Sequence, residues 1–216
     1  MCIRDSMFTV GLGPAANSAF AVSTMAIAIP TGVKVLNWLG TTWGGSLRLD
    51  TSMLFALGFI AMFTIGGLSG VMHASAPSDA QQQDTYFVVA HFHYVLFGGA
   101  ILAIFGGIYM WWPKMFGWKL SEGWGKLNFW LMLIGFNLTF FPMHWLGMDG
   151  MPRRVYTYPA DQGWEGSNMA ATVGAFLIAT SVLVWVINVI ISWRRNDRAG
   201  GDPWDGRTLE LSLIHI

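Results

Sequence analysis

The stretch Gln83-Asp-Thr-Tyr-Phe-Val-Val-Ala-His-Phe-His-Tyr-Val95 places two histidines, His91 and His93, inside the start of a long apolar run. A titratable side chain is costly in a segment that can span a membrane, so its presence there points to function. On an α-helix, residues two positions apart are separated by about 200°, so the two rings leave opposite faces. Two histidines that share one metal ion are spaced i, i+4 instead. The spacing therefore favours one helix that gives one ligand to each of two cofactors, and a pair of interfacial histidines bonded to nearby carbonyls is the alternative.

The composition indicates a protein of the lipid bilayer. The 216 residues are 54% hydrophobic and only 11% charged, with a mean hydropathy of +0.48, whereas soluble domains carry about 25% charged residues. Twelve Trp and fifteen Phe are typical of proteins with aromatic belts at the membrane interfaces. The formal net charge is zero, so nothing favours a nucleic-acid partner. A single cysteine, Cys2, excludes an internal disulfide framework.

Five apolar spans are each long enough to cross a bilayer, which takes about 20 helical residues. They cover approximately residues 15–39, 53–72, 87–112, 127–146 and 169–193. Short polar loops join the spans, and no linker marks a second domain. The predicted fold is therefore all-α, a polytopic membrane helix bundle. Glycine pairs inside the spans, such as Gly66-Gly67 and Gly98-Gly99, indicate close helix packing or room for a flat cofactor against the backbone.

Basic residues are distributed unevenly between the loops. If the spans alternate in direction, one side carries Arg48, Lys114, Lys119, Lys126, Arg194, Arg195 and Arg198. The loops of the opposite side carry only Arg153 and Arg154. The positive-inside rule therefore places the C-terminus in the cytoplasm, and the two histidines near the outer surface.

The pair Arg153-Arg154 allows two interpretations. The arginines could anchor lipid headgroups, or they could clamp carboxylates or phosphates of a cofactor through paired hydrogen bonds. Asp79 and Asp84 lie in the other outer loop, just before the histidines. Carboxylates bind hard divalent cations, so Asp84 is a candidate ligand for such an ion.

The first span contains a proline and a lysine, in Ile29-Pro-Thr-Gly-Val-Lys34. Pro30 removes a backbone donor, frees the carbonyl of Ala26 and predicts a kink. Thr31 and Lys34 are spaced i, i+3 and lie on one face. Lys34 could extend to the inner interface, which is the usual fate of a lysine near the end of a span. It could instead relay protons that enter from the inner side.

Five motifs carry a resemblance to a known family: Phe8-Thr-Val-Gly-Leu-Gly13, Ile29-Pro-Thr-Gly-Val-Lys34, the run Asp84–Val95, Gly135-Phe-Asn-Leu-Thr-Phe-Phe-Pro-Met-His144, and Gly150-Met-Pro-Arg-Arg-Val-Tyr156. With them the chain resembles subunit I of cytochrome c oxidase, a member of the haem–copper oxidases. The resemblance extends from about residue 7 to residue 210. It implies the C-terminal part of that subunit, its eighth to twelfth helices.

The resemblance implies a role for the histidines and for the charged residues near them. His91 would be the proximal ligand of the high-spin haem, where oxygen is reduced. His93 would be one of two axial ligands of the low-spin haem, whose second histidine lies outside this chain. Arg153, Arg154 and Asp79 would lie at the haem propionates, and both haems are expected to be of the a type.

The resemblance also assigns the remaining candidates. Lys34 and Thr31 would belong to a proton channel, which reverses the preference for an interfacial lysine. Asp84 would bind a magnesium ion at the outer side. The family has a histidine directly before this aspartate and this chain has Gln83, whose carbonyl oxygen can still coordinate a metal.

The resemblance breaks at both ends of the chain. Directly before Met-Phe-Thr the family has two histidines that bind copper, and this chain has Asp5 and Ser6. At the other end, Leu211 stands where the family continues with tryptophan. We therefore expect residues 1–6 and 211–216 to be non-native sequence, and the copper ligands to lie outside this chain.

The implied function is that of a terminal respiratory oxidase in a bacterial inner membrane rather than a mitochondrial one. The enzyme would pass electrons from cytochrome c to oxygen, form water and pump protons, with subunits II and III as partners and with this fragment inactive alone. A quinol oxidase of the same superfamily is the alternative, although Asp84 and Tyr156-Thr-Tyr158 favour cytochrome c. A non-haem transporter or a structural membrane fragment is the hypothesis from a different class.

Overall fold

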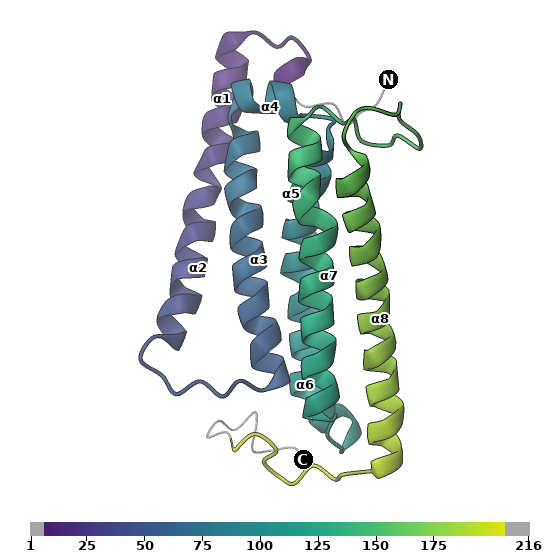
Figure 1. Ribbon diagram of the computed structural model, residues 1–216. Helices are drawn as coiled ribbons and strands as arrows, with labels where there is room; N and C mark the ends of the chain where they lie inside the picture. The colour runs from purple at the N-terminus through teal and green to yellow at the C-terminus, as the bar shows by residue number, and fades with distance from the viewer. Residues whose placement is uncertain (1–6, 206–216) are drawn as a thin grey trace.

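The computed structural model describes residues 7–205, in which the chain folds into helices joined by loops (Figure 1). The α-helices are α1 (Pro14–Ala26), α2 (Ala28–Thr42), α3 (Thr51–Ala74), α4 (Ala76–Gln82), α5 (Tyr86–Leu96), α6 (Leu102–Phe116), α7 (Glu122–Met148) and α8 (Glu165–Arg195). A 3₁₀ turn, η1 (Met7–Thr9), precedes α1, and a π-helical turn, η2 (Phe97–Ile101), joins α5 to α6. The expectation that residues 1–6 and 211–216 are non-native lies outside the described residues.

The described part of the chain contains five helical segments that are long and apolar enough to cross a membrane. They cover residues 14–42, 51–74, 86–116, 122–148 and 165–195, and each contains one of the predicted spans. Figure 1 shows them as adjacent columns whose connections alternate between the two ends of the molecule. The prediction of an all-α membrane helix bundle is confirmed.

The helices extend beyond the apolar spans because their polar ends still favour helix. α7 begins at Glu122 and α8 at Glu165, and a carboxylate in the first turn interacts favourably with the helix dipole. At its C-terminus, α8 carries Arg194 and Arg195 in the last turn, where positive charge is favourable for the same reason. Hydropathy alone does not detect such turns.

The first span is interrupted close to Pro30, where the sequence predicts a kink. α1 ends at Ala26 and α2 begins at Ala28, with Ile27 between them. Pro30 lies in the first turn of α2, where a missing backbone N–H costs little. Neither α1 nor α2 has a buried residue, and Figure 1 shows both to one side of α3.

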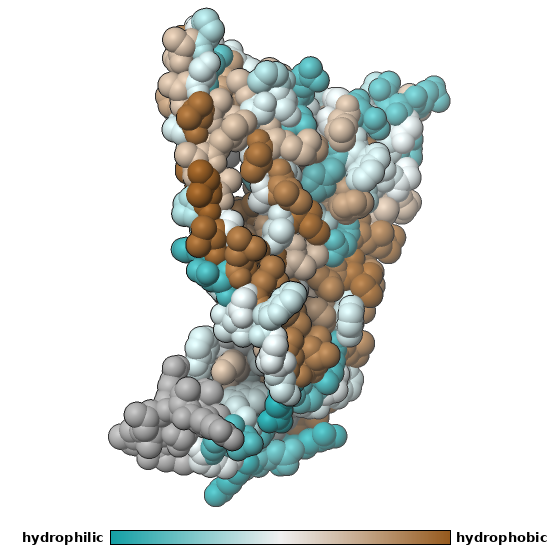
Figure 2. Space-filling model, turned by 90° about the vertical axis from the view of Figure 1, so that its left-hand side faces the viewer, coloured by the Kyte–Doolittle hydropathy of each residue, from teal (hydrophilic) through white to brown (hydrophobic). Residues whose placement is uncertain are grey.

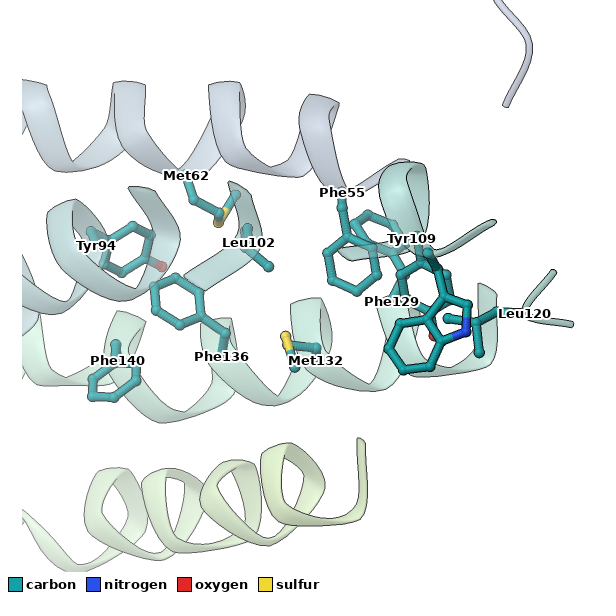
Figure 3. Packing of buried hydrophobic residues seen from close by; sticks show 11 residues of the cluster. Phe55, Met62, Tyr94, Leu102, Tyr109, Leu120, Phe129, Met132, Phe136 and Phe140 are labelled. Carbon is teal, nitrogen blue, oxygen red and sulfur yellow. The ribbon is translucent and has the colours of Figure 1, made fainter. Parts of the chain in front are cut away.

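The core is formed by side chains from α3, α5, α6 and α7 (Figure 3). Phe55, Tyr94 and Phe136 are completely buried, and the Tyr94 and Phe136 rings meet at 4.8 Å in an edge-to-face contact. The close approach of α3 to η2 depends on Gly98, because a Cβ there would lie 2.8 Å from Cβ of Met62. The predicted packing role of this glycine is confirmed, and the core fixes α5 between α3 and α7.

Buried polar side chains join α7 to α8. Asn128 donates from Nδ2 to Oγ of Ser181 at 2.8 Å, and the Ser181 hydroxyl donates back to the carbonyl of Asn128 at 2.8 Å. Both residues are fully buried. An unsatisfied polar group costs several kcal/mol in an apolar environment, so such paired bonds favour one register of the two helices.

The closest approach of α7 and α8 gives a prediction for stability. A Cβ on Gly174 would lie 2.5 Å from the backbone nitrogen of Thr139, so Gly174→Ala should force the helices apart and cost about 1–3 kcal/mol. Gly166→Ala, in the same helix, meets nothing within 4 Å and is the control. Thermal unfolding of the chain in detergent micelles should show a lower midpoint for Gly174→Ala alone. Equal midpoints for both variants would contradict the observed helix contact.

Candidate functional site

A cavity of about 550 Å³ lies between the first span and α3, with His91 of α5 in its wall. Thr31 and Gly67 also line it, and the other lining residues are largely apolar. A Cβ on Gly66 would lie 3.0 Å from Tyr94, whereas one on Gly67 would meet nothing within 4 Å. The first glycine of the pair therefore permits helix packing, and the second leaves space beside the backbone. Figure 2 shows the molecule from the side of α1 and α2, with apolar side chains gathered between more hydrophilic ends.

His91 is held through one ring nitrogen. Its Nδ1 lies 3.0 Å from the carbonyl oxygen of Gly66 and 2.9 Å from Oγ of Ser69, both on α3. A proton on Nδ1 donates to these acceptors and leaves the lone pair on Nε2. Nε2 has no hydrogen-bond partner among the described residues. Metal-binding histidines are commonly oriented in this way by a bond from the other nitrogen.

His93 lies on the opposite face of α5. Its ring stacks on Phe140 of α7, with 4.1 Å between centroids and 14° between planes. Its Nδ1 lies 2.8 Å from the carbonyl oxygen of Val89. The prediction that the two histidines point to opposite sides is confirmed, because His91 contacts α3 and His93 contacts α7. The carbonyl bonds expected of interfacial histidines are present as well, but they occupy Nδ1 and not Nε2.

His73, a residue without a role in the sequence-based prediction, lies behind His91. The two ring centroids are 5.1 Å apart. Nδ1 of His73 lies 3.3 Å from Oδ1 of Asp79, and both side chains are nearly buried. His73 therefore lies between Asp79, which it contacts through Nδ1, and His91, against whose ring it packs. The role of Asp79 at the haem propionates stays a prediction. The sequence signal that could have identified His73 was the presence of a histidine in the last turn of an apolar span.

The loop that contains Asp84 and the loop that contains Arg153 are joined by an ion pair between these two side chains. The backbone amide of Arg153 donates to the carbonyl of Asp84 at 2.9 Å, and that of Tyr86 donates to the carbonyl of Met151 at 3.0 Å. The Arg153 side chain is only 16% exposed, and its Nε has no partner among the described residues. Arg154 is exposed.

The remaining candidate residues of the sequence analysis do not all lie at the cavity. Thr31 lines the cavity and donates to the carbonyl of Ile27 at 3.1 Å, whereas Lys34 is exposed on α2. The backbone amide of Gln83 donates to the carbonyl of Asp79 at 2.8 Å. The described residues contain no group of three His, Cys, Asp or Glu side chains arranged for a metal ion. The magnesium site at Asp84 and Gln83 stays a prediction.

A family model described as cytochrome c and quinol oxidase polypeptide I matches residues 6–177. The chain belongs to this family. Cytochrome c oxidase subunit 1 of Bacillus sp. (strain PS3) is 55% identical over 208 residues, which cover 96% of this chain and 34% of that protein. Quinol oxidase subunit 1 of Bacillus subtilis (strain 168) is 50% identical over 205 residues, covering 94% and 32%. The chain thus spans about a third of the length of these curated relatives.

The fold agrees with this family. A solved structure of a heme-copper terminal oxidase dimer, determined by cryo-EM, matches with a TM-score of 0.71 and 19% sequence identity. The match covers 97% of this chain and 40% of that one. The same helix arrangement therefore occurs in an oxidase of distant sequence.

The residues around the cavity fit the haem that the family implies. The volume lies within the range of about 300–1,000 Å³ that is usual for ligand sites, and the lining is apolar with few polar groups. His91 supplies an imidazole whose Nε2 is free of other bonds. A Cβ on Gly67 would meet nothing within 4 Å, so this lining residue leaves space for a macrocycle beside the backbone.

The Arg153–Asp84 pair gives a second prediction. Asp84→Asn should weaken the contact between the two loops by about 1–3 kcal/mol, because it leaves the nearly buried guanidinium of Arg153 without its counter-ion. The cost is at the low end expected for a buried pair, because the Asp84 carboxylate is partly exposed to solvent. Trypsin should then cleave faster after Arg153 and Arg154. Asp161→Asn is the control, since both aspartates have positive φ, and it should leave cleavage unchanged. Equal cleavage rates in the two variants would show that the ion pair does not hold the loop.

Proposed function

We propose that this chain is part of the catalytic subunit of a terminal respiratory oxidase that transfers electrons from cytochrome c to oxygen. The observation that carries the proposal is the opposed pair His91 and His93, each held through Nδ1 with Nε2 left for a metal. In this proposal Nε2 of His91 would hold the high-spin haem in the cavity, and Nε2 of His93, on the other face of α5, would hold the low-spin haem.

The protein holds both imidazoles in fixed orientations. Gly66 and Ser69 fix His91, while Val89 and the Phe140 ring fix His93. When bound, the two haems supply electron transfer and the reduction of oxygen to water. The lining on the His91 side is largely apolar, so electrostatic interactions there are less screened than in bulk water. At the positions of Asp5 and Ser6 the family has two histidines that bind copper, so in this proposal the copper ligands are not supplied by this chain.

Charged residues at the proposed outer end of the helix bundle are candidates for binding the cofactors. Arg153 and Arg154 bind haem propionates in this proposal, with Asp79 nearby, and the buried Nε of Arg153 is a donor that still requires an acceptor. Asp84, which already contacts Arg153, and Gln83 are the proposed magnesium ligands. The a type of both haems and this metal site rest on family resemblance.

Proton uptake is proposed along the first span. Thr31 lines the cavity, and Lys34 is three residues further along α2, toward the basic end of the molecule and outside the cavity lining. Because Pro30 has no N–H, the carbonyl of Ala26 lacks its usual helix donor, so a water molecule can bond there. In this proposal Lys34 and Thr31 carry protons from the inner side toward His91, and the complete enzyme couples oxygen reduction to proton pumping.

The proposed membrane orientation is based on the basic residues of the loops, and the proposed type of membrane is based on the relatives. The ends of the helices that carry most Lys and Arg residues face the cytoplasm in this proposal, with the C-terminus among them. The bacterial relatives support a bacterial inner membrane. Subunits II and III are the proposed partners. Cytochrome c is proposed as donor because cytochrome c oxidase relatives reach 56% identity, against 50% for quinol oxidases, which stay the alternative.

The histidine assignment is tested by spectra of the complete subunit. His93→Ala should abolish the low-spin haem spectrum and keep high-spin haem at least partly bound, and His91→Ala should do the reverse, because the rings face opposite sides. The control is His144→Gln, which changes the buried histidine of α7 and should keep both spectra. A wild-type protein without haem absorbance would favour a transporter, and loss of copper alone in either variant would contradict the assignment.

The proton path is tested with Lys34→Met in the complete enzyme. This substitution preserves length and apolar volume and removes the ammonium group, so turnover should fall by roughly 10²-fold while both haems stay bound. Reduction of the high-spin haem should become slow in rapid-mixing experiments. Lys126→Met, also near the inner end, should keep its turnover. Normal turnover in Lys34→Met would return Lys34 to an interfacial role.

A further inference from the structure

Three polar atoms meet behind His91 in a closed triangle. The hydroxyl of Ser69 donates to the carbonyl oxygen of Gly66 at 2.9 Å. Oγ of Ser69 also lies 2.9 Å from Nδ1 of His91, and Nδ1 lies 3.0 Å from the same Gly66 oxygen. Ser69 is only 5% exposed. No other hydrogen-bond partner of this Nδ1 occurs among the described residues, so the triangle contains its complete set of bonds there.

The donors and acceptors of the triangle can be counted. A neutral imidazole that keeps its Nε2 lone pair carries its proton on Nδ1. The Ser69 hydroxyl adds a second proton, which goes to Gly66. The Nδ1 proton is therefore shared between the Gly66 carbonyl and Oγ of Ser69. Donation by Ser69 polarises its own oxygen, which makes this oxygen a stronger acceptor for the imidazole proton.

Local helix structure does not explain this arrangement. A serine in a helix often donates to a carbonyl one turn earlier, and Ser23 of α1 does so to Ala19 at 2.9 Å. Ser69 differs in its second contact, which crosses to α5. The ring of His91 packs closely on α3 beside this serine, because a Cβ on Gly70 would lie 3.0 Å from its Cε1. The contact is thus built into the α3–α5 packing.

We propose that Ser69 is a positioning residue that strengthens electron donation from His91 to the haem iron. The proposal rests on the proposed function, in which Nε2 of His91 is the proximal ligand. A second acceptor for the Nδ1 proton draws that proton toward itself and raises the basicity of the ligand. The carbonyl of Gly66 supplies one such acceptor in any sequence, since it belongs to the backbone. Ser69 adds the acceptor that a side-chain substitution can remove.

The test is the iron–histidine stretching vibration of the reduced high-spin haem, measured by resonance Raman spectroscopy on the complete subunit. Ser69→Ala should shift this band to lower wavenumber and raise the reduction potential of the same haem, because the ligand donates less charge. Ser69→Thr keeps the hydroxyl and should restore the wild-type band. Ser69→Cys keeps the side-chain size with a weaker hydrogen-bonding group, so it should shift the band downward even if the alanine variant does not fold.

Ser23→Ala is the matched control, since it removes a serine whose hydroxyl bonds only to carbonyls of its own helix among the contacts described, and its band should stay at the wild-type position. A band that stays or rises in both Ser69→Ala and Ser69→Cys overturns the inference while leaving His91 as the ligand. Absence of any iron–histidine band in the wild-type protein instead contradicts the proposed function itself. A downward shift in Ser69→Thr equal to that in Ser69→Ala also overturns the inference, because the hydroxyl would then be irrelevant.

Discussion

The angular offset between neighbouring positions of a helix determines the geometry of this site. Residues two apart on α5 differ by about 200° in direction, so His91 and His93 face α3 and α7 respectively. One rigid helix therefore holds two imidazoles at a fixed separation, and motion of one helix relative to the bundle would displace both. The packing of α5 between α3 and α7 is the feature on which the proposed chemistry depends.

Polar groups inside an apolar bundle must be satisfied, and each histidine meets this requirement through Nδ1. The carbonyls of Gly66 and Val89 accept from the two rings, so the fold itself selects which nitrogen is free. The same requirement explains why the nearly buried guanidinium of Arg153 is paired with the carboxylate of Asp84 in the neighbouring loop. Bonds that satisfy buried polar groups are thus also the bonds that orient the proposed ligands.

Hydropathy predicted the five spans, and helix geometry predicted the opposed histidines. Pro30 predicted the interruption of the first span, because it lacks a backbone N–H. Each of these features follows from composition or from local geometry within one segment. The helix ends at Glu122 and Glu165, the short helix α4 and the π-helical turn were not predicted, since polar end turns and local bulges leave no periodic apolar pattern. Contacts between distant segments were also missed. Ser69 and His73 of α3 contact His91 of α5. These contacts join different segments of the chain, and the residues next to Ser69 and His73 in the sequence do not specify them.

The central claim is that one helix carries one axial ligand for each of two separate haems. A density map of the complete subunit with its cofactors, fine enough to place both imidazole rings, tests it most directly. The account predicts an iron beside Nε2 of His91 in the cavity next to α3, and a different iron beside Nε2 of His93 on the opposite side of α5. Both rings directed at the same iron, or either Nε2 bonded only to protein groups, would contradict it.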